Sequence, residues 1–219
     1  MKYYTLETSL NKQIMGNLPQ VKEIIHDCNV QEESEFIDDF PFQKINFEPN
    51  LSSAVLNKRS NLTDLIDVGG IGFSYGSILM SNRLKKIIAK FKTCGIDFYE
   101  TQVFQGDKRH LGFWQTHVYK VPYDAVNFLK TKIELTDRDR NRNLLKEELS
   151  ISSKSEFLNI AKFISYPKMI KMKDVKFNSN LELDFFFLRY FETKNIVSDK
   201  LKNEIEKNNI TGIEFKPLE

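Results

Sequence analysis

The chain has few residues of the kinds that build catalytic and metal sites. Its 219 residues include two cysteines, three histidines and one tryptophan. Cys28 and Cys94 are far apart in sequence and belong to no CxxC motif, so we expect two free thiols rather than a disulfide or a zinc site. The histidines, His26, His110 and His117, form no HExxH-type pattern. We therefore predict neither a metal nor a cofactor.

An excess of one charge and long apolar runs are also missing. The 32 basic and 30 acidic residues give a net charge of +2, which argues against a nucleic-acid-binding surface. No apolar run approaches the roughly 20 residues that cross a bilayer. Residues 1–7 lack the apolar segment of a signal peptide. We expect a cytoplasmic protein that binds neither membrane nor nucleic acid; steeply salt-dependent binding would instead support a nucleic-acid module.

The chain has the length and the aromatic content of a globular protein. Hydrophobic residues make up 41% and charged residues 28%, as in globular proteins. A chain of this length buries about 70% of its unfolded surface, so we predict one globular unit over residues 1–219. The 18 phenylalanines and eight tyrosines supply a core and leave aromatics for an interface. Trp114 is our candidate partner-binding residue, although a place at the core edge is equally consistent with the sequence.

A helix-then-strand segment occurs twice, at residues 81–98 and 198–215. Such a repeat at fixed spacing indicates duplication. Eight of the 18 positions are identical: Ser81/Ser198, Leu84/Leu201, Lys85/Lys202, Ile88/Ile205, Lys90/Lys207, Gly95/Gly212, Ile96/Ile213 and Phe98/Phe215.

The repeated residues have structural rather than catalytic roles. Ser81 and Ser198 are favourable N-cap residues, and the apolar residues after them recur at helical spacing. The second helix should be more exposed, because Glu204 replaces an isoleucine of the first copy. Gly95 and Gly212 are expected where each helix stops and the chain reverses. The alternating residues that follow each glycine predict half-buried strands.

The rest of the chain predicts an α+β fold of two related halves, about 1–135 and 136–219. Each half would place a helix on a mostly antiparallel sheet. We expect residues 29–60 to be irregular and residues 137–142 to be a solvated connection between the halves, with binding of phosphates or an acidic partner as the alternative. Further predicted strands span residues 2–6, 96–104, 113–121, 171–175 and 181–189, and further helices lie near residues 18–28 and 153–164, the second opened by a capping box at Ser153–Glu156.

The glycines of Gly69–Gly76 provide a hypothesis of another class. Their spacing is one residue too long for GxGxxG, and no strand–loop–helix unit surrounds them. We interpret them as a turn or bulge. The alternative is an enzyme or a small-molecule or nucleotide-binding protein that uses this loop, which a ligand-dependent rise in melting temperature would support.

The second repeat also carries a family pattern. The sequence reads FFLRYF at 186–191, IVSDKLK at 196–202 and ITGIEF at 210–215, and the first half carries MSNRL at 80–84 and GIDFY at 95–99. This pattern resembles a bacterial family of immunity proteins from polymorphic toxin systems, best over residues 185–216 and fairly over 62–130. The first copy departs at residues 93–94, which read TC where the second copy has IT.

The resemblance implies an intracellular protein that binds a cognate toxin, encoded by the adjacent gene, and neutralises it stoichiometrically without catalysis. It assigns no cofactor. Family-motif positions in this sequence are structural: Ser81, Leu84, Gly95, Phe98, Ser198, Leu201, Gly212 and Phe215.

Overall fold

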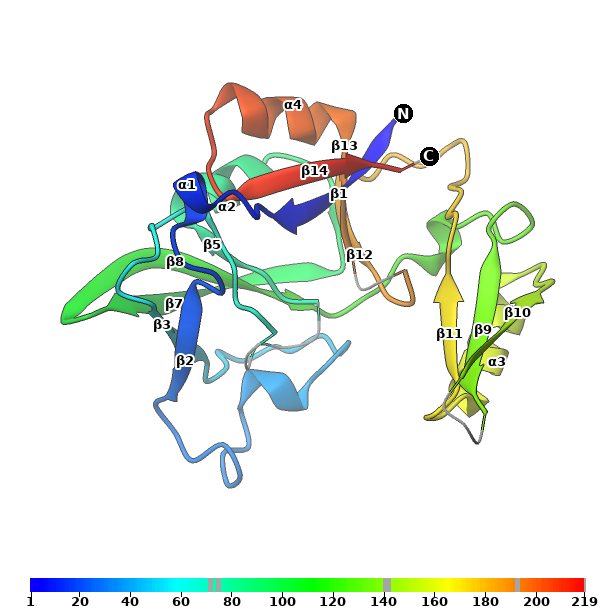
Figure 1. Cartoon of the computed structure of the whole chain (residues 1–219), viewed down its shortest axis with the longest axis horizontal. Coiled ribbons are helices and arrows are strands. Elements are labelled where there is room, and N and C mark those ends of the chain that lie inside the picture. Colours follow the sequence, from blue (N-terminus) through cyan, green and yellow to red (C-terminus); the bar gives the residue numbers. More distant parts are fainter. Residues whose placement is uncertain (71–72, 74–75, 140–142, 192–193, 219) are drawn as a thin grey trace.

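The structure, a computed structural model, describes residues 1–70, 73, 76–139, 143–191 and 194–218. These residues form an α+β fold, as predicted, with three β-sheets (Figure 1). The helices are α1 (Lys12–Met15), α2 (Asn82–Ile88), α3 (Lys154–Phe163) and α4 (Asp199–Lys207), with short 3-10 turns at Ile37–Asp39 and Tyr123–Ala125.

Two sheets form the main body of the molecule. The first has the order β14 (Ile213–Pro217), β1 (Tyr3–Thr8), β13 (Lys194–Ser198), β12 (Phe185–Leu188) and β6 (Thr93–Cys94). The second has the order β2 (Val21–His26), β3 (Ser52–Leu56), β7 (Ile96–Gln105), β8 (Lys108–Val118), β5 (Leu79–Ser81) and β4 (Leu65–Ile66). Neighbouring strands are antiparallel except for the pairs β12–β6 and β3–β7, which are parallel.

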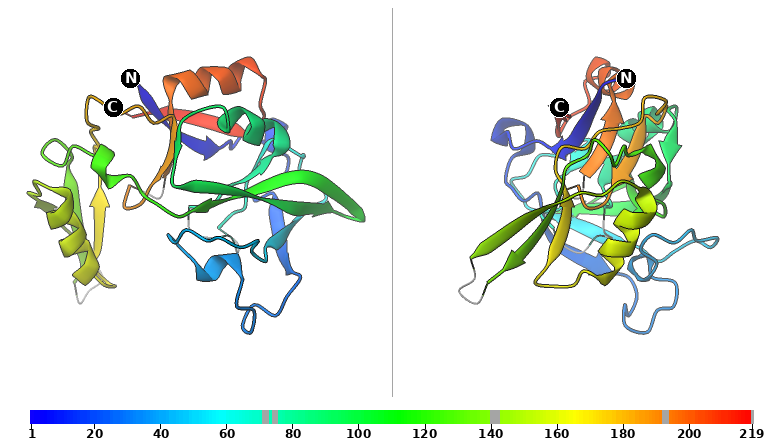
Figure 2. Two further views of the ribbon diagram at one scale, coloured as in Figure 1. Left: turned by 180° about the vertical axis from the view of Figure 1, so that it is seen from behind. Right: turned by 90° about the vertical axis from the view of Figure 1, so that its right-hand side faces the viewer.

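The third sheet and α3 form a lobe at one side of the molecule (Figures 1 and 2). Its order is β10 (Leu144–Leu149), β9 (Ile133–Arg138) and β11 (Met169–Met172). The lobe has its own apolar cluster, which includes Phe128, Ile133 and Phe157. That cluster continues into the main body through Phe186 and Ile196.

The two repeat helices are packed in one core. Leu84 and Ile88 of α2 share an apolar cluster with Leu201 and Ile205 of α4. The α4 helix buries Leu201 and Ile205, whereas α2 buries Ile87 as well as Leu84 and Ile88, so the prediction of a more exposed second helix is confirmed.

The strands around the repeats correspond in order. In the first unit, β8 pairs with both β5 and β7. In the second unit, β1 pairs with both β13 and β14. The strand that completes the second unit therefore comes from the N-terminal end of the chain.

Two predictions about the first 60 residues are wrong. The segment expected as a helix at 18–28 forms β2, because β-branched Val21, Ile24 and Ile25 are stiff and the edge of β3 is available for pairing. The segment expected to be irregular contains β3, which is buried along its whole length. Ser52 and Ser53 interrupt the apolar pattern that would have indicated this strand. The Ser52 hydroxyl lies 2.9 Å from His26 Nδ1, within hydrogen-bond distance.

The charged connection expected at 137–142 is also corrected. Asp137 and Arg138 belong to β9, and the chain returns as β10 in an antiparallel hairpin. Both strands that flank this segment lie in the lobe, so it does not join two halves, and residues 140–142 lie outside the described part of the chain.

The capping box of α3 is confirmed, but its second hydrogen bond is shifted by one residue. Ser153 Oγ accepts from Glu156 N at 3.2 Å, while the Glu156 carboxylate accepts from Ser152 N at 2.8 Å.

The repeated glycines adopt positive φ, +70° at Gly95 and +84° at Gly212. They do not end the helices, which finish at Ile88 and Lys207, but lie where the chain enters the next strand. Close packing adds to the conformational requirement at Gly212. A Cβ there would overlap the Leu65 carbonyl oxygen and approach Thr63 Oγ1 at 2.9 Å.

We expect Gly212→Ala to lower the free energy of unfolding by more than Gly106→Ala. Both glycines have positive φ, but a Cβ at Gly106, in the β7–β8 turn, meets nothing within 4 Å. The control should lose about 1 kcal/mol from backbone strain alone. Denaturant unfolding of both variants measures the difference, and equal losses would contradict the packing argument.

A second stability prediction concerns Glu7 on β1. Its carboxylate accepts from Lys194 Nζ and Lys216 Nζ, each at 2.7 Å. Burial raises the pKa of this carboxyl, but the two lysines outweigh burial and lower it to about 2. The lowered pKa contributes stability that is fully present above the unfolded-state value of 4.5 and is lost as the pH falls toward 2.

Glutamine does not titrate in this range. The free energy of unfolding of Glu7→Gln should therefore fall less than that of the wild type between pH 4.5 and pH 2. Unfolding free energies measured across this range test it, with Glu100→Gln at an exposed β7 position as control. An acid dependence in Glu7→Gln identical to that of the wild type would refute the assignment.

Candidate functional site

The predicted N-caps form the best-defined polar arrangement in the motif. Ser81 Oγ accepts from Leu84 N at 3.3 Å and donates to Asp64 Oδ1 at 2.6 Å. Ser198 Oγ likewise accepts from Leu201 N at 3.2 Å and donates to Asp184 Oδ1 at 2.6 Å. In both units, then, a carboxylate before the first hairpin strand orients the serine that starts the helix.

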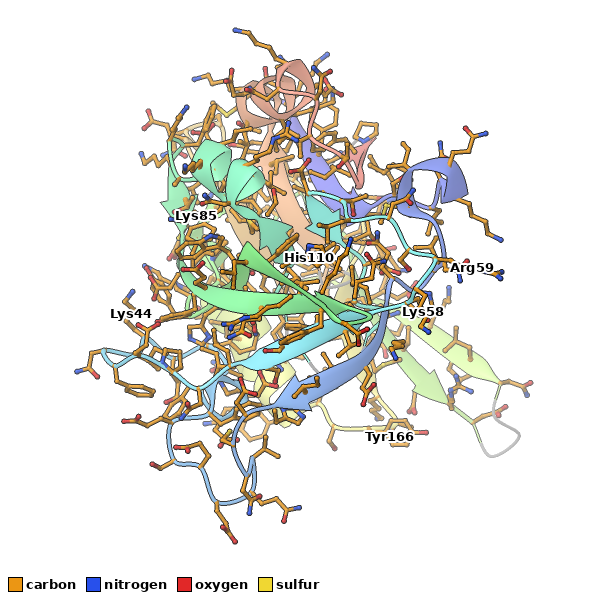
Figure 3. All side chains as sticks on the ribbon, turned by 90° about the vertical axis from the view of Figure 1, so that its left-hand side faces the viewer. Lys44, Lys58, Arg59, Lys85, His110 and Tyr166 are labelled. Carbon is orange, nitrogen blue, oxygen red and sulfur yellow. The ribbon has the colours of Figure 1, made fainter. Side chains whose placement is uncertain are left out.

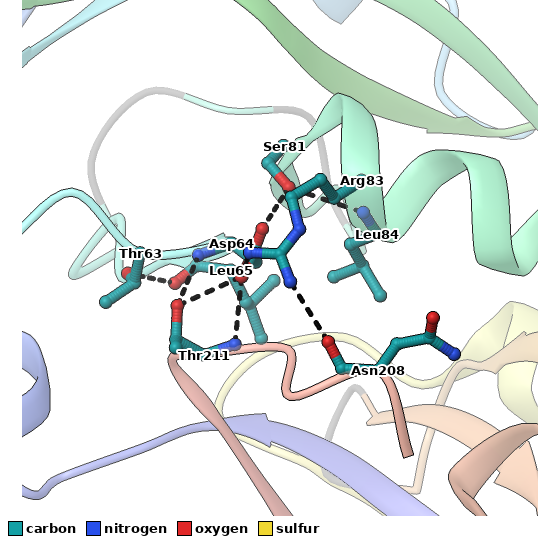
Figure 4. Close-up of polar contacts among 8 residues, drawn as sticks. All are labelled: Thr63, Asp64, Leu65, Ser81, Arg83, Leu84, Asn208 and Thr211. Atoms are coloured by element: carbon teal, nitrogen blue, oxygen red, sulfur yellow. Dashed lines mark hydrogen bonds and ion pairs between the residues drawn. The ribbon is translucent and has the colours of Figure 1, made fainter. Parts of the chain in front are cut away.

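The second oxygen of each carboxylate reaches the other unit. Asp64 Oδ2 accepts from both Thr211 N and Thr211 Oγ1 at 3.0 Å (Figure 4). Asp184 Oδ2 accepts from Lys92 N at 3.2 Å. We call these two arrangements the carboxylate clasps, centred on Asp64 and Asp184. Each clasp joins the hairpin and helix start of one unit to the segment after the helix of the other.

The clasp at Asp64 is buried and has further contacts. Asp64 is 5% exposed, and Arg83 Nη1 lies 3.4 Å from its Oδ2. Arg83 also donates to Asn208 O at 3.0 Å, so its guanidinium bridges the carboxylate and the end of α4 (Figure 4). All these partners are internal, which makes the clasp an architectural site.

Sequence reasoning missed both aspartates because they lie outside the repeated 18 residues. They precede their serines by 17 and 14 positions, so a search at fixed spacing does not align them. The available signal was an aspartate directly before an apolar strand in each unit, Asp64-Leu65 and Asp184-Phe185.

The apolar motif residues pack around the same core. Leu84 and Leu201 are fully buried, whereas Phe98 and Phe215 are partly buried against the shared cluster. The ring of Phe215 also lies under Lys202 Nζ, which is 5.6 Å from its centroid.

Trp114 is half-buried on β8, opposite Met80 and Glu100. Lys85 Nζ lies 4.1 Å from the centroid of its ring. Its indole Nε1 is buried and has no hydrogen-bond partner among the described residues. The side chain is thus positioned by α2 and β8, and a role in partner binding stays a prediction.

The glycine loop is only partly described, since residues 71–72 and 74–75 lie outside the described part. Gly69 and Gly70 form a turn with positive φ. A Cβ at Gly76 would lie 2.6 Å from the ring of Phe187, and one at Gly69 would lie 2.5 Å from Pro19. These two glycines permit close packing against apolar side chains.

The histidines and cysteines do not come together in one site. His110 and His117 lie seven residues apart on β8 (His110 is labelled in Figure 3), and His117 Nε2 is 2.8 Å from Gln43 O. Cys28 and Cys94 are free thiols. Within the described residues, no group of three or more potential ligands is placed to hold a metal ion. In that same part of the chain, no helix has the length and apolar character needed to cross a membrane.

We predict that Asp64→Asn lowers the free energy of unfolding by about 1.5–3 kcal/mol, because an amide NH2 would oppose either the Ser81 hydroxyl or the Thr211 N–H. Asp184→Asn should act in the same direction. Asp67→Asn is the control, since that carboxylate accepts one exposed bond from Gly69 N at 3.2 Å. Denaturant unfolding provides the measurement. A loss at Asp64 no larger than that of the control would contradict the importance of the clasp.

Comparison with known protein families gives a match over almost the whole chain. The model of the immunity protein family Imm11 matches residues 3–219. No curated protein matches the chain. The match includes both repeats, both carboxylate clasps and the lobe. This chain belongs to the Imm11 immunity protein family.

Proposed function

We propose that this protein neutralises a cognate toxin by binding it directly in a one-to-one complex, without catalytic turnover. The observation that carries the proposal is the family match over residues 3–219. The internal contacts of the motif agree with it, because the carboxylate clasps and buried leucines serve to build a rigid body. A rigid surface binds a partner with less loss of conformational entropy than a flexible one.

The finer parts of the proposal concern place and partner. We propose that the protein acts in the cytoplasm and that the toxin is encoded by the adjacent gene. Trp114 remains a candidate contact residue. The alternative, a small-molecule or nucleotide site at Gly69–Gly76, has less support, because Gly69 and Gly76 pack against Pro19 and Phe187.

We also propose that the two units arose by duplication, each with a helix on a mostly antiparallel sheet. The support is the sequence repeat at 81–98 and 198–215 together with the matching clasps. The halves would then share one globular unit over residues 1–219.

Co-expression with the product of the adjacent gene tests the function. We expect the toxin alone to arrest growth, this protein to restore it, and the two to purify as a one-to-one complex. Titration of the purified toxin should then show its activity falling linearly and reaching zero at one equivalent. That end point follows from tight stoichiometric binding.

Two results would separate the alternatives. Inhibition at far below one equivalent would indicate turnover and overturn the stoichiometric mechanism. A neighbouring gene product that is harmless, or that does not bind, would remove the support for this partner. A small-molecule thermal-shift screen would then test the Gly69–Gly76 alternative.

A further inference from the structure

The outer edge of β10 is the longest regular strand edge that the described residues leave without a neighbour. Six residues, Leu144–Leu149, pair with β9 in one continuous register, and no described strand pairs with their other side. The order β11, β9, β10 places this edge on the side of the lobe that faces away from the main body (Figure 1). Open edges of this kind are uncommon, because their unpaired backbone groups recruit other strands.

The other described edges are short, covered or interrupted. The β4 and β6 strands have two residues each, and β11 has four, with Met172 N donating to Tyr190 O at 2.6 Å. The β2 edge has a register irregularity between Val21 and Glu23, and β14 ends in Pro217. A bulge or a proline weakens pairing at an edge. The β10 strand has neither feature.

The backbone groups that face the open edge are those of Leu144, Lys146 and Glu148. At the hairpin end, Asp139 N donates to Asn143 O at 3.0 Å, so Asn143 belongs to a hydrogen-bonded pair with β9. Such pairs alternate along an antiparallel ladder, so the odd-numbered residues of β10 bond to β9 and the even-numbered residues face outward.

The sequence of this strand is complementary to itself. When two copies pair antiparallel about a twofold axis, the position of the axis alone decides which residues lie opposite each other. With the axis at Glu147, Lys146 of each copy lies opposite Glu148 of the other, which gives two pairs of opposite charge. On the other face, Leu145 of each copy lies opposite Leu149 of the other. Leu145 is 52% exposed in the single chain, so this pairing would cover apolar surface.

The neighbouring twofold registers lack this complementarity. An axis at Lys146 places that lysine opposite its own copy. An axis at Glu148 pairs that glutamate with itself and leaves Lys146 opposite Ser150. The axis at Glu147 retains one like-charge contact, between the two copies of that exposed residue. Two pairs of opposite charge and two leucine pairs outweigh this single contact.

We propose that β10 pairs with β10 of a second copy of this chain, antiparallel and with the twofold axis at Glu147. The sheets of the two lobes would then continue into each other across the axis. A single strand pair is smaller than a standard interface of roughly 1,200–2,000 Å², so we expect a weak dimer with a Kd in the micromolar range. The inference is independent of the proposed function, because it concerns only this chain.

The test reverses the charges of the Lys146–Glu148 pairs one residue at a time. Lys146→Glu and Glu148→Lys each turn both pairs into like-charge pairs, so either variant alone should dimerise about tenfold more weakly or worse. A mixture of the two variants should recover the wild-type Kd to within about threefold, because every pair across the axis again joins a lysine to a glutamate. Sedimentation equilibrium at protein concentrations up to about 1 mM measures these constants.

A matched control carries the same charge changes outside β10. Lys58→Glu and Glu32→Lys lie at exposed positions, and each variant and their mixture should dimerise as the wild type does. Glu147→Gln removes the like-charge contact on the axis and should tighten the dimer by about threefold. Melting temperatures establish that each variant is folded.

A disulfide on the axis gives a second measurement that leaves Lys146 in place. Residues at the axis form a pair without backbone hydrogen bonds, with Cα atoms about 4.5 Å apart, which a disulfide can span. Mild oxidation should therefore link Glu147→Cys into a covalent dimer. Glu148→Cys is the control, because its two copies are offset by about 7 Å along the strands. The wild type accounts for the native thiols of Cys28 and Cys94.

Three results would overturn the proposal. The first is a wild type that stays monomeric up to about 1 mM, which would leave the edge to a strand of another protein. The second is a dimer that the charge reversals do not weaken, which would place the interface elsewhere. The third is a mixture of the two variants that fails to recover dimerisation. None of these results bears on neutralisation of a toxin, which is measured separately.

Discussion

The reciprocal carboxylate clasps are the constraint on which the arrangement of the main body depends. Asp64 and Asp184 each use one oxygen to orient the serine that starts a helix, and the other to bind backbone beyond the helix of the opposite unit. A buried carboxylate is stable only when hydrogen bonds satisfy it. Buried Asp64 binds Ser81 and Arg83 of its own unit and Thr211 of the other. Half-buried Asp184 binds Ser198 of its own unit and Lys92 N of the other, so the hydrogen bonds of each aspartate are complete only when both units are in place. The apolar faces of α2 and α4 then meet in one cluster.

The two units also differ in where along the chain their central strand comes from. The second unit takes its central strand, β1, from the N-terminal end, whereas the first unit takes the corresponding β8 from the hairpin that follows its own β7. The ends of the chain are consequently paired, through Leu6 opposite Phe215. Glu7 is satisfied by lysines from both strands that flank β1. Pairings of such long sequence separation place both terminal segments in the same sheet.

The sequence predicted those parts of the fold in which local preferences and tertiary packing agree. Ser81 and Ser198 cap helices, and Gly95 and Gly212 have positive φ, because each role is set by one residue and its neighbours. The β2 and β3 strands were missed because their pairing with each other decides the conformation, against a helical spacing in one and paired serines in the other. The clasps were missed for a related reason. Hydrogen bonds between residues 147 positions apart, as from Thr211 to Asp64, leave no mark in local periodicity.

The repeated and the unrepeated elements occupy different parts of the molecule. The repeated positions are occupied by internal contacts, so substitutions there change folding first. Among the elements that the structure describes, the lobe of β9, β10, β11 and α3 has no counterpart in the first unit, and it packs on the body through apolar side chains around Phe186 and Ile196. Its outer strand can therefore change sequence without disturbing the carboxylate clasps. The lobe therefore offers a surface that can vary in sequence while the shared core of α2 and α4 stays the same.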